Sequence, residues 1–300
     1  MPTTITGVLP IIHTPFTADD QLDVDSLHRE LEWALTRNIN GYCTGMVSEL
    51  LRLSQEERNQ LHREIGSVDR GDKVFIAGVG AESTSQATAY AERATEYGCD
   101  ALMVIPPVTA KTSLPDLRDY FTSVANSVDV PVIIQDASSY VGQEIPMQLN
   151  VELLDTFGPE KIMFKPEAAP LGPKLSELRD ATNGRARAFE GSGGISIIDS
   201  YRRGIKGTMP GMEFLDSVIA VWSALEAGDD DAAYAAYLPL CALVSLQLQA
   251  GLDGFIAIEK YILHKRGTFA TDLRRRPYLY NLDEETRQEV DRLMHRANLT

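Results

Sequence analysis

The sequence contains little cysteine, little positive charge and no long apolar run. Its 300 residues include three cysteines, Cys43, Cys99 and Cys241, with no Cys-x-x-Cys pair among them. This spacing indicates neither a disulfide framework nor a zinc site. Lysine and arginine number 28 against 43 aspartates and glutamates, a formal net charge of −15. Because such a surface repels nucleic acid phosphates and anionic membranes, we expect neither as a partner.

Targeting segments and metal motifs are missing as well. No stretch of 18 apolar residues occurs, and residues 1–10 contain no basic region and no long apolar run. We therefore expect a cytoplasmic protein. The five histidines show neither His-x-His nor His-Glu-x-x-His spacing, so we expect no metal ion and no cofactor. His13 alone stands at the end of a predicted strand, where a structural role is the simpler interpretation.

Eight short apolar runs alternate with segments of helical periodicity, and each run is followed by such a segment. The runs are residues 8–12, 41–44, 74–79, 101–105, 130–135, 161–165, 185–189 and 207–209. This alternation fits a closed barrel of eight parallel strands better than an open doubly wound sheet. The sequence therefore predicts an α/β fold, a (β/α)8 TIM barrel, over residues 1–227.

After residue 227 the pattern changes to helices alone. Residues 230–250, 253–265 and 284–297 have helical periodicity, and no further strand pattern follows. We predict that residues 228–300 form a C-terminal extension of three helices packed against the barrel.

One lysine stands at the carboxyl end of a predicted barrel strand. Residues 161–165 read Lys-Ile-Met-Phe-Lys, and Pro166, which cannot extend a ladder, turns the chain outward. Barrels of this kind take their catalytic groups from the carboxyl ends of strands, so Lys165 is a candidate, whereas lysines at strand beginnings are structural. A partly desolvated lysine amine can attack a carbonyl and form a Schiff base. Alternatively, Lys165 holds a substrate carboxylate as a charge.

Four motifs lie in order along nearly the whole chain. They are Gly7-Val-Leu-Pro10 with Thr14-Pro-Phe16, Gly45-Met-Val-Ser-Glu49, Val130-Pro-Val-Ile-Ile134 and Phe164-Lys165. Together they resemble the dihydrodipicolinate synthase and N-acetylneuraminate lyase family. The resemblance implies a Schiff-base barrel whose sixth-strand lysine, here Lys165, condenses with pyruvate or another 2-oxo acid. It also implies a homo-oligomer, a dimer of dimers.

Two loops depart from the family pattern. Where the family has Gly-Thr-Thr-Gly-Glu, this chain keeps one hydroxyl, that of Ser48. The resemblance assigns substrate binding to Val47 and Ser48, through the hydroxyl and the backbone N–H groups; the alternative is that Ser48 only caps a turn. The family ends its fifth strand in Tyr-Asn, with the tyrosine as proton shuttle, and this chain has Gln135-Asp136. An amide does not titrate, so Gln135 can only orient the substrate.

Another group must therefore transfer the proton. Tyr140 and Ser48 rank first, because their counterparts in the resemblance face the substrate, and Asp136 and Glu167 are further candidates. Glu167 is also expected to bind the substrate.

A glycine-rich turn, Gly191-Ser-Gly-Gly194, follows the seventh predicted strand. Barrels often place anion-binding amides after this strand, so Gly191 and Gly193 are expected to face the substrate. The alternative is a plain flexible turn.

The end of the fifth predicted strand, Gln135-Asp136, and the segment Lys165-Pro-Glu167 are similar to the sequences of one branch of the family, which dehydrates 2-keto-3-deoxy sugar acids. Dehydration tolerates loss of the phenol better than aldol cleavage, because it needs only the imine and a modest acid or base. We therefore predict a Schiff-base lyase acting on a 2-oxo acid, specifically a 2-keto-3-deoxy sugar acid dehydratase. The alternatives are a pyruvate-dependent aldolase or synthase of the same family, and a non-catalytic 2-oxo acid binding protein.

Overall fold

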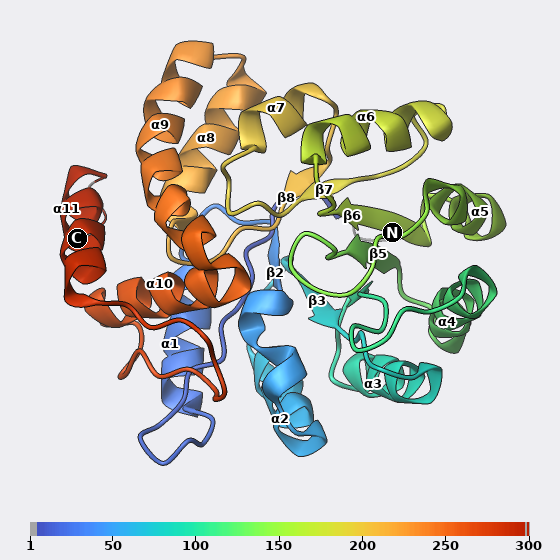
Figure 1. Cartoon of the computed structure of the whole chain (residues 1–300), viewed down its shortest axis with the longest axis horizontal. Coiled ribbons are helices and arrows are strands. Elements are labelled where there is room, and N and C mark those ends of the chain that lie inside the picture. The colour runs from blue at the N-terminus through green and yellow to red at the C-terminus, as the bar shows by residue number, and fades with distance from the viewer. Residues whose placement is uncertain (1–4, 298, 300) are drawn as a thin grey trace.

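A ring of eight parallel strands forms the centre of the computed structural model, which describes residues 5–297 and 299 (Figure 1). The strands are β1 (Gly7–Val8), β2 (Gly41–Cys43), β3 (Val74–Gly78), β4 (Ala101–Val104), β5 (Val132–Asp136), β6 (Ile162–Pro166), β7 (Phe189–Glu190) and β8 (Gly207–Thr208). They form two sheet segments, β1-β8-β7 and β2-β3-β4-β5-β6. Parallel bridges from Ile11 to Cys43 and from Phe164 to Ala188 join the segments and close the ring. The predicted α/β barrel is confirmed.

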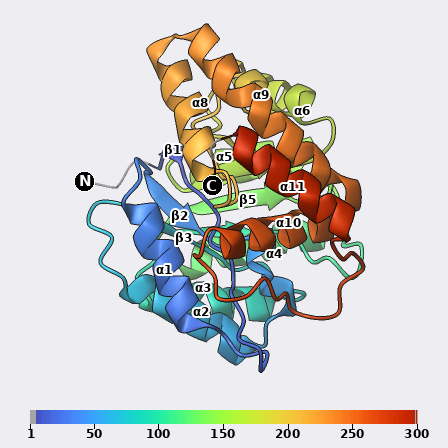
Figure 2. The same cartoon turned by 90° about the vertical axis from the view of Figure 1, so that its left-hand side faces the viewer.

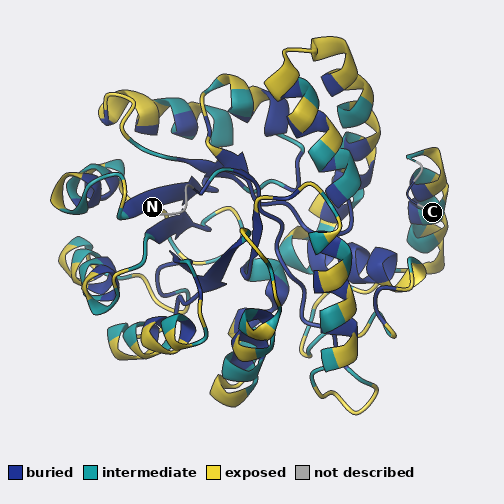
Figure 3. Ribbon diagram, turned by 180° about the vertical axis from the view of Figure 1, so that it is seen from behind, coloured by how far each residue is buried: buried dark blue, intermediate teal, exposed yellow. Residues whose placement is uncertain are grey.

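A helix follows each strand and packs on the outside of the ring, as Figures 1 and 3 show. These helices are α1 (Val24–Leu35), α2 (Gln55–Ser67), α3 (Thr84–Glu96), α4 (Leu114–Ser127), α5 (Met147–Phe157), α6 (Leu171–Ala181), α7 (Ile197–Arg202) and α8 (Leu215–Ala227). Helix α2 begins at the capping box in which Ser54 and Glu57 satisfy each other's backbone N–H groups.

Strands β1, β7 and β8 are only two residues long, shorter than the apolar runs that predict them. Prolines account for part of the difference, because Pro10 and Pro210 have no N–H to donate to a ladder. The backbone remains paired beyond the strand ends: Leu9 N donates to Thr208 O at 2.9 Å, and Ile11 N donates to Pro210 O at 2.7 Å. The ring is therefore continuous even where the strands are not regular.

Alternation along the strands decides which side chains face the interior of the barrel. On β6, Ile162 and Phe164 belong to the large apolar cluster between strands and helices, whereas Met163 belongs to the cluster inside the ring. Because side chains alternate along a strand, Lys165 points to the same side as Met163, into the barrel. Gln135, paired with Lys165 in the sheet register, likewise follows the inward-facing Ile133.

Three further helices follow the barrel: α9 (Asp230–Gln247), α10 (Gly251–Lys265) and α11 (Glu284–Arg296). Helix α9 packs beside α8, and α10 lies against the loop that follows β2 (Figure 2). Every residue of α10 from Gly254 to Leu263 is buried. The three helices match the predicted ones closely, while the predicted domain boundary after residue 227 stays a prediction.

The stretch Asp230–Lys265 is apolar and long enough, by composition alone, to cross a membrane, with a mean hydropathy of 1.5 in its most apolar window. In the structure it is two helices separated by the short helix η3 (Leu248–Ala250), and the second helix begins at Gly251, whose φ is +54°. Its apolar side chains pack on α8 and on the barrel. These packing contacts account for the 44% of its most apolar window that is buried, whereas Leu238 and Leu248 of the same stretch are exposed.

Candidate active site

A cavity with about 420 Å³ of empty space lies at the carboxyl end of the barrel. Side chains and backbone from strand ends form most of its wall, and α10 closes one side. The lining residues are Ile11, Met46, Val47, Gln135, Tyr140, Lys165, Glu167, Gly191, Gly193, Met209, Gly211, Leu252, Phe255 and Glu259. Seven of the nine candidate residues are among them, and Ser48 and Asp136 are not. The two carboxylate oxygens of Asp136 accept from the backbone N–H groups of Ser138 and Ile145.

Lys165, Glu167 and Gln135 form a hydrogen-bonded group at the base of the cavity. Residues two apart on an extended chain point to the same side, which brings Lys165 and Glu167 together. The Lys165 Nζ lies 3.3 Å from Glu167 Oε2, and both side chains are buried. Gln135 Nε2 donates to the same carboxylate oxygen. Gln135 therefore fixes the position of Glu167 next to the amine.

Burial decides the protonation of Glu167. Loss of solvent raises the pKa of its carboxyl group, and the charge of Lys165 and the bond from Gln135 offset part of that effect. The neighbouring Glu190, at the end of β7, raises the pKa further. A raised pKa lets the carboxyl group keep its proton to higher pH, which suits a group that gives and takes a proton.

Both carboxylate oxygens of Glu190 accept hydrogen bonds from neighbouring residues. Its Oε2 accepts from Thr208 Oγ1 at 2.6 Å, and its Oε1 accepts from the backbone N–H of Ser192 at 2.7 Å. These bonds hold the loop that carries Gly191 and Gly193 against the cavity. Glu190 is not among the site residues predicted from the sequence, although it directly follows a predicted barrel strand, the position where such barrels place functional groups.

Gly191 leaves room for the lysine amine. A Cβ on Gly191 would lie 2.8 Å from Lys165 Nζ and also closer than 3.0 Å to Glu167 Oε1. We expect Gly191→Ala to displace the flexible lysine end rather than unfold the protein, and to slow imine formation with pyruvate about 100-fold. The rate of borohydride-trapped adduct, read by mass spectrometry, measures this. Gly172→Ala, whose methyl would meet the surface pair Asp199 and Arg203, is the control. Equal rates in the two variants would contradict the prediction.

Ser48 lies in the short helix η1 (Met46–Ser48), behind the cavity wall. Its hydroxyl donates to the carbonyl of Ile12 and accepts from the backbone N–H of Gly45 at 2.9 Å. In this arrangement the Ser48 hydroxyl caps a turn, which is the alternative stated above for this residue. The neighbouring Val47 lines the cavity. The predicted role of Ser48 in proton transfer stays a prediction.

Tyr140 reaches the cavity from the loop after β5. Its ring packs edge-on against Phe255 of α10, with ring centroids 6.0 Å apart. Burial, and then the charges of Glu167, Glu190 and Glu259, raise the pKa of the phenol. The phenol therefore stays protonated, so Tyr140 can donate a hydrogen bond to a substrate but is a poor base.

A buried acidic network lies behind the wall formed by α10. His13 Nδ1 is 2.9 Å from Glu30 Oε1, and His13 Nε2 is 3.0 Å from Glu259 Oε2. Burial alone would lower the pKa of His13. The hydrogen bonds and charges of the two carboxylates outweigh burial and raise this pKa to about 10. His13 is accordingly an imidazolium that donates to both glutamates, as the structural interpretation of this histidine requires.

Glu213 completes the network. Its Oε1 accepts from Gln247 Nε2 at 2.8 Å, and burial together with the charge of Glu259 raises its pKa to about 8. Ligand atoms of His13, Glu213 and Glu259 lie within 4.8 Å of one another, close enough to hold a metal ion. The imidazolium already supplies positive charge at this place, so the absence of a metal ion stays our prediction.

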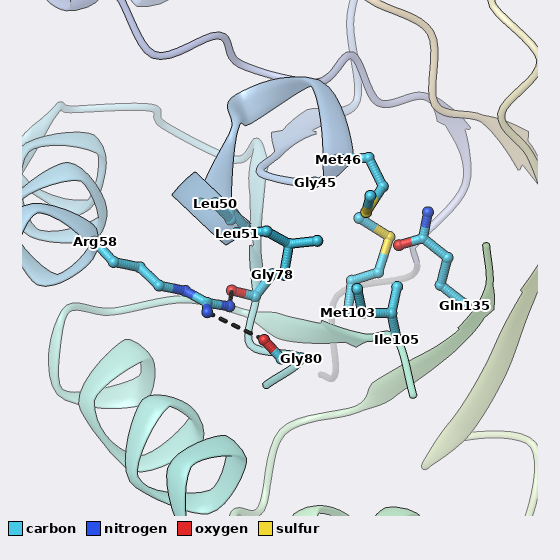
Figure 4. Close-up of a pocket in the computed structure, with 10 residues that line it drawn as sticks. All are labelled: Gly45, Met46, Leu50, Leu51, Arg58, Gly78, Gly80, Met103, Ile105 and Gln135. Atoms are coloured by element: carbon cyan, nitrogen blue, oxygen red, sulfur yellow. Dashed lines mark hydrogen bonds between the residues drawn. The ribbon is translucent and has the colours of Figure 1, made fainter. Parts of the chain in front are cut away.

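An apolar pocket adjoins the cavity and shares Met46 and Gln135 with it. Figure 4 shows the side chains of Met46, Met103 and Gln135 pointing toward one another in the wall of this apolar pocket. On the far side, the buried Arg58 donates to the carbonyls of Gly78 and Gly80. Since both of these bonds are internal, we assign this arginine a structural role.

Comparison with known proteins agrees with the resemblance that the motifs indicate. The sequence pattern of the dihydrodipicolinate synthetase family matches residues 4–297. The chain belongs to this family. A 4-hydroxy-tetrahydrodipicolinate synthase from Methanosarcina barkeri is 30% identical over 180 residues, which cover 59% of each chain. The chain thus spans 59% of the length of this curated relative.

Solved structures of the dihydrodipicolinate synthetase family have the same fold. A dihydrodipicolinate synthase from Rhodopseudomonas palustris superimposes with a TM-score of 0.88 at 23% identity, covering 99% of both chains. A prophage protein of the family from Escherichia coli K12, in complex with pyruvate, superimposes with a TM-score of 0.89 at 21% identity, again over 99% of both chains.

The predicted family membership is confirmed. The narrower similarity to the dehydratase branch is not, because the named relatives are synthases and none is named a dehydratase. The dimer of dimers and the cytoplasmic location stay predictions.

Proposed function

We propose that the protein is a Schiff-base lyase that condenses Lys165 with pyruvate or a longer 2-oxo acid. One observation carries the proposal: the buried amine of Lys165 faces a cavity at the carboxyl end of the barrel, 3.3 Å from a carboxyl group that can exchange a proton. The family neighbour from Escherichia coli, whose structure contains pyruvate, supports the choice of 2-oxo acid.

The chemistry follows from this pair. The neutral amine attacks the C2 carbonyl, and Glu167 gives a proton to the resulting hydroxyl so that it leaves as water. The iminium then draws electrons from C3, and Glu167, now a carboxylate, takes a proton from that carbon. Gln135 keeps the carboxylate in place, and backbone next to Val47 holds the substrate carboxylate.

Two reactions can follow the enamine. The names of the relatives favour carbon–carbon bond formation or cleavage, the aldolase or synthase alternative of the sequence analysis. The site favours dehydration as a second candidate: Gln135 stands where the family has its shuttle tyrosine, and Glu167 can pass its proton to a leaving hydroxyl on C4. We keep the 2-keto-3-deoxy sugar acid dehydratase as this second candidate.

Product analysis distinguishes these reactions. Purified protein is incubated with 2-keto-3-deoxy pentonates and hexonates, and the products are identified by mass spectrometry. Pyruvate together with an aldehyde would identify an aldolase and refute the dehydratase. A product that keeps every carbon and has lost one water would identify the dehydratase. If no acid in the panel were consumed, both cleavage and dehydration of these acids would be refuted, and the synthase and non-catalytic alternatives would remain.

The turnover of the variant Tyr140→Phe shows whether this phenol is the group that transfers the proton. Because its raised pKa makes the phenol a poor base, we expect Tyr140→Phe to lower turnover only about 3- to 10-fold, the loss of one hydrogen bond. The measurement is kcat with the substrate identified by product analysis. A loss of 1,000-fold or more would instead make Tyr140 the proton-transfer group that the sequence analysis ranks first.

A further inference from the structure

We propose that Glu259 forms a subsite for the hydroxyl groups at the far end of the substrate and excludes substrates that end in a second carboxylate. The assignment rests on the proposed function, because it takes the near end of the substrate to be a 2-oxo acid bound at Lys165. It concerns a residue of the C-terminal helices, outside the barrel motifs.

Glu259 presents one oxygen to the cavity. It lies on α10 with 1% of its surface exposed, and its Oε2 is taken by His13 at 3.0 Å. Its Oε1 is 2.8 Å from the position that a Cβ on Gly211 would occupy, and both Gly211 and Glu259 line the cavity. Within the described part of the chain, no hydrogen bond reaches this oxygen. A substrate hydroxyl donating to Oε1 would supply its missing partner.

The carboxylate is held rigidly. His13 is bound on its other side by Glu30, and the backbone N–H of His13 also donates to Glu30 at 3.1 Å. His13 and Glu30 are therefore positioning residues, which fix the direction of Oε1 before the substrate arrives. A pre-oriented acceptor binds a donor without the entropy cost of ordering a free side chain.

The charges of the cavity decide what the subsite accepts. Among the described residues that line it, Lys165 has the only cationic side chain, and Glu167 pairs with that lysine. A second substrate carboxylate would therefore meet Glu259 in a network where two glutamates, Glu259 and Glu30, share the one imidazolium of His13, so that the repulsion is only partly offset. A hydroxyl group meets an acceptor instead. Phe255 and Leu252 beside Glu259 offer apolar surface to the carbon atoms of the same chain.

The test compares the wild-type protein with Glu259→Gln. Glutamine keeps an acceptor for His13 and puts an amide donor where Oε1 was. We measure the concentration dependence of borohydride-trapped adducts with three acids: pyruvate, 2-keto-3-deoxygluconate, and the analogue whose terminal CH2OH is oxidised to a carboxylate. We expect the variant to bind the hydroxyl-ended acid about 10- to 100-fold more weakly and the carboxylate-ended acid more tightly, with pyruvate unchanged.

Affinities for the two longer acids that change in opposite directions distinguish the subsite from damage to the fold, because damage to the fold would weaken the binding of all three acids. Asp253→Asn is the matched control, since this carboxylate of the same helix binds Arg52 and the backbone of Leu279 and does not line the cavity. If Glu259→Gln left the ratio of the affinities for the two longer acids unchanged, the assignment would be overturned. A wild-type protein that bound an ammonium-ended or an unsubstituted alkyl acid more tightly than the hydroxyl-ended acid would also overturn it. Failure of pyruvate to form any adduct would contradict the proposed function instead, and calorimetric titration of the two longer acids would still test Glu259.

Discussion

Lys165→Arg is expected to abolish imine formation and to lower turnover on the order of 10³-fold or more, while the protein stays folded. Arginine keeps the positive charge beside Glu167, but a guanidinium is not deprotonated in proteins and cannot act as the nucleophile. Because the charge is retained, this variant separates covalent catalysis from electrostatic binding of a substrate carboxylate. The measurements are kcat/KM and the mass of the protein after borohydride reduction with pyruvate.

Lys161→Arg is the matched control, at the position directly before the same strand. Its amine donates to the backbone carbonyl of Val130 at 2.8 Å, at the opposite end of the barrel from the cavity. This variant should form the adduct as the wild-type protein does. If Lys165→Arg still turned over at the wild-type rate with an unchanged thermal unfolding midpoint, the Schiff-base mechanism would be wrong.

The second large effect is expected for Glu167→Gln, about 10²- to 10⁴-fold in turnover, the usual contribution of a general acid or base. Glutamine preserves the shape of the side chain and cannot exchange a proton. The mechanism needs Glu167 protonated when the carbinolamine hydroxyl leaves, and its raised pKa keeps that proton in place to higher pH, so the wild-type rate should fall as pH rises through the pKa of this carboxyl group. The variant should lose that fall, and its borohydride-trapped imine should form more slowly than that of the wild-type protein.

Glu144→Gln provides a comparison, since its carboxylate is exposed at the surface, where it pairs with Lys174. It should change neither the rate nor the pH profile. A Glu167→Gln variant that kept the wild-type pH profile would show that another group moves the proton, and Tyr140 would then be the next candidate.

The base of the candidate site could be predicted from the sequence, because strand ends and alternation decide it. A closed parallel barrel brings the residues after β5 and β6 to one edge, and the alternation on β6 turns Lys165 inward. The two-residue spacing then places Glu167 beside it, and the sheet register places Gln135 opposite. These relations depend on local geometry alone.

The wall formed by α10 could not be predicted in this way. His13 and Glu259 are 246 positions apart, and their bond depends on how the C-terminal helices pack against the barrel. No spacing rule links a strand end to a helix outside the repeating unit. The hydroxyl of Ser48 is a smaller example: its direction depends on the fold of a four-residue turn, which side-chain type alone does not specify.

The most direct test of the account is to reduce the wild-type protein with borohydride in the presence of pyruvate and to map the modified peptide. We predict one reduced pyruvate adduct per chain, located on Lys165, and none when either pyruvate or borohydride is omitted. An unmodified protein, or an adduct on a different lysine, would contradict the central claim that Lys165 is the Schiff-base residue.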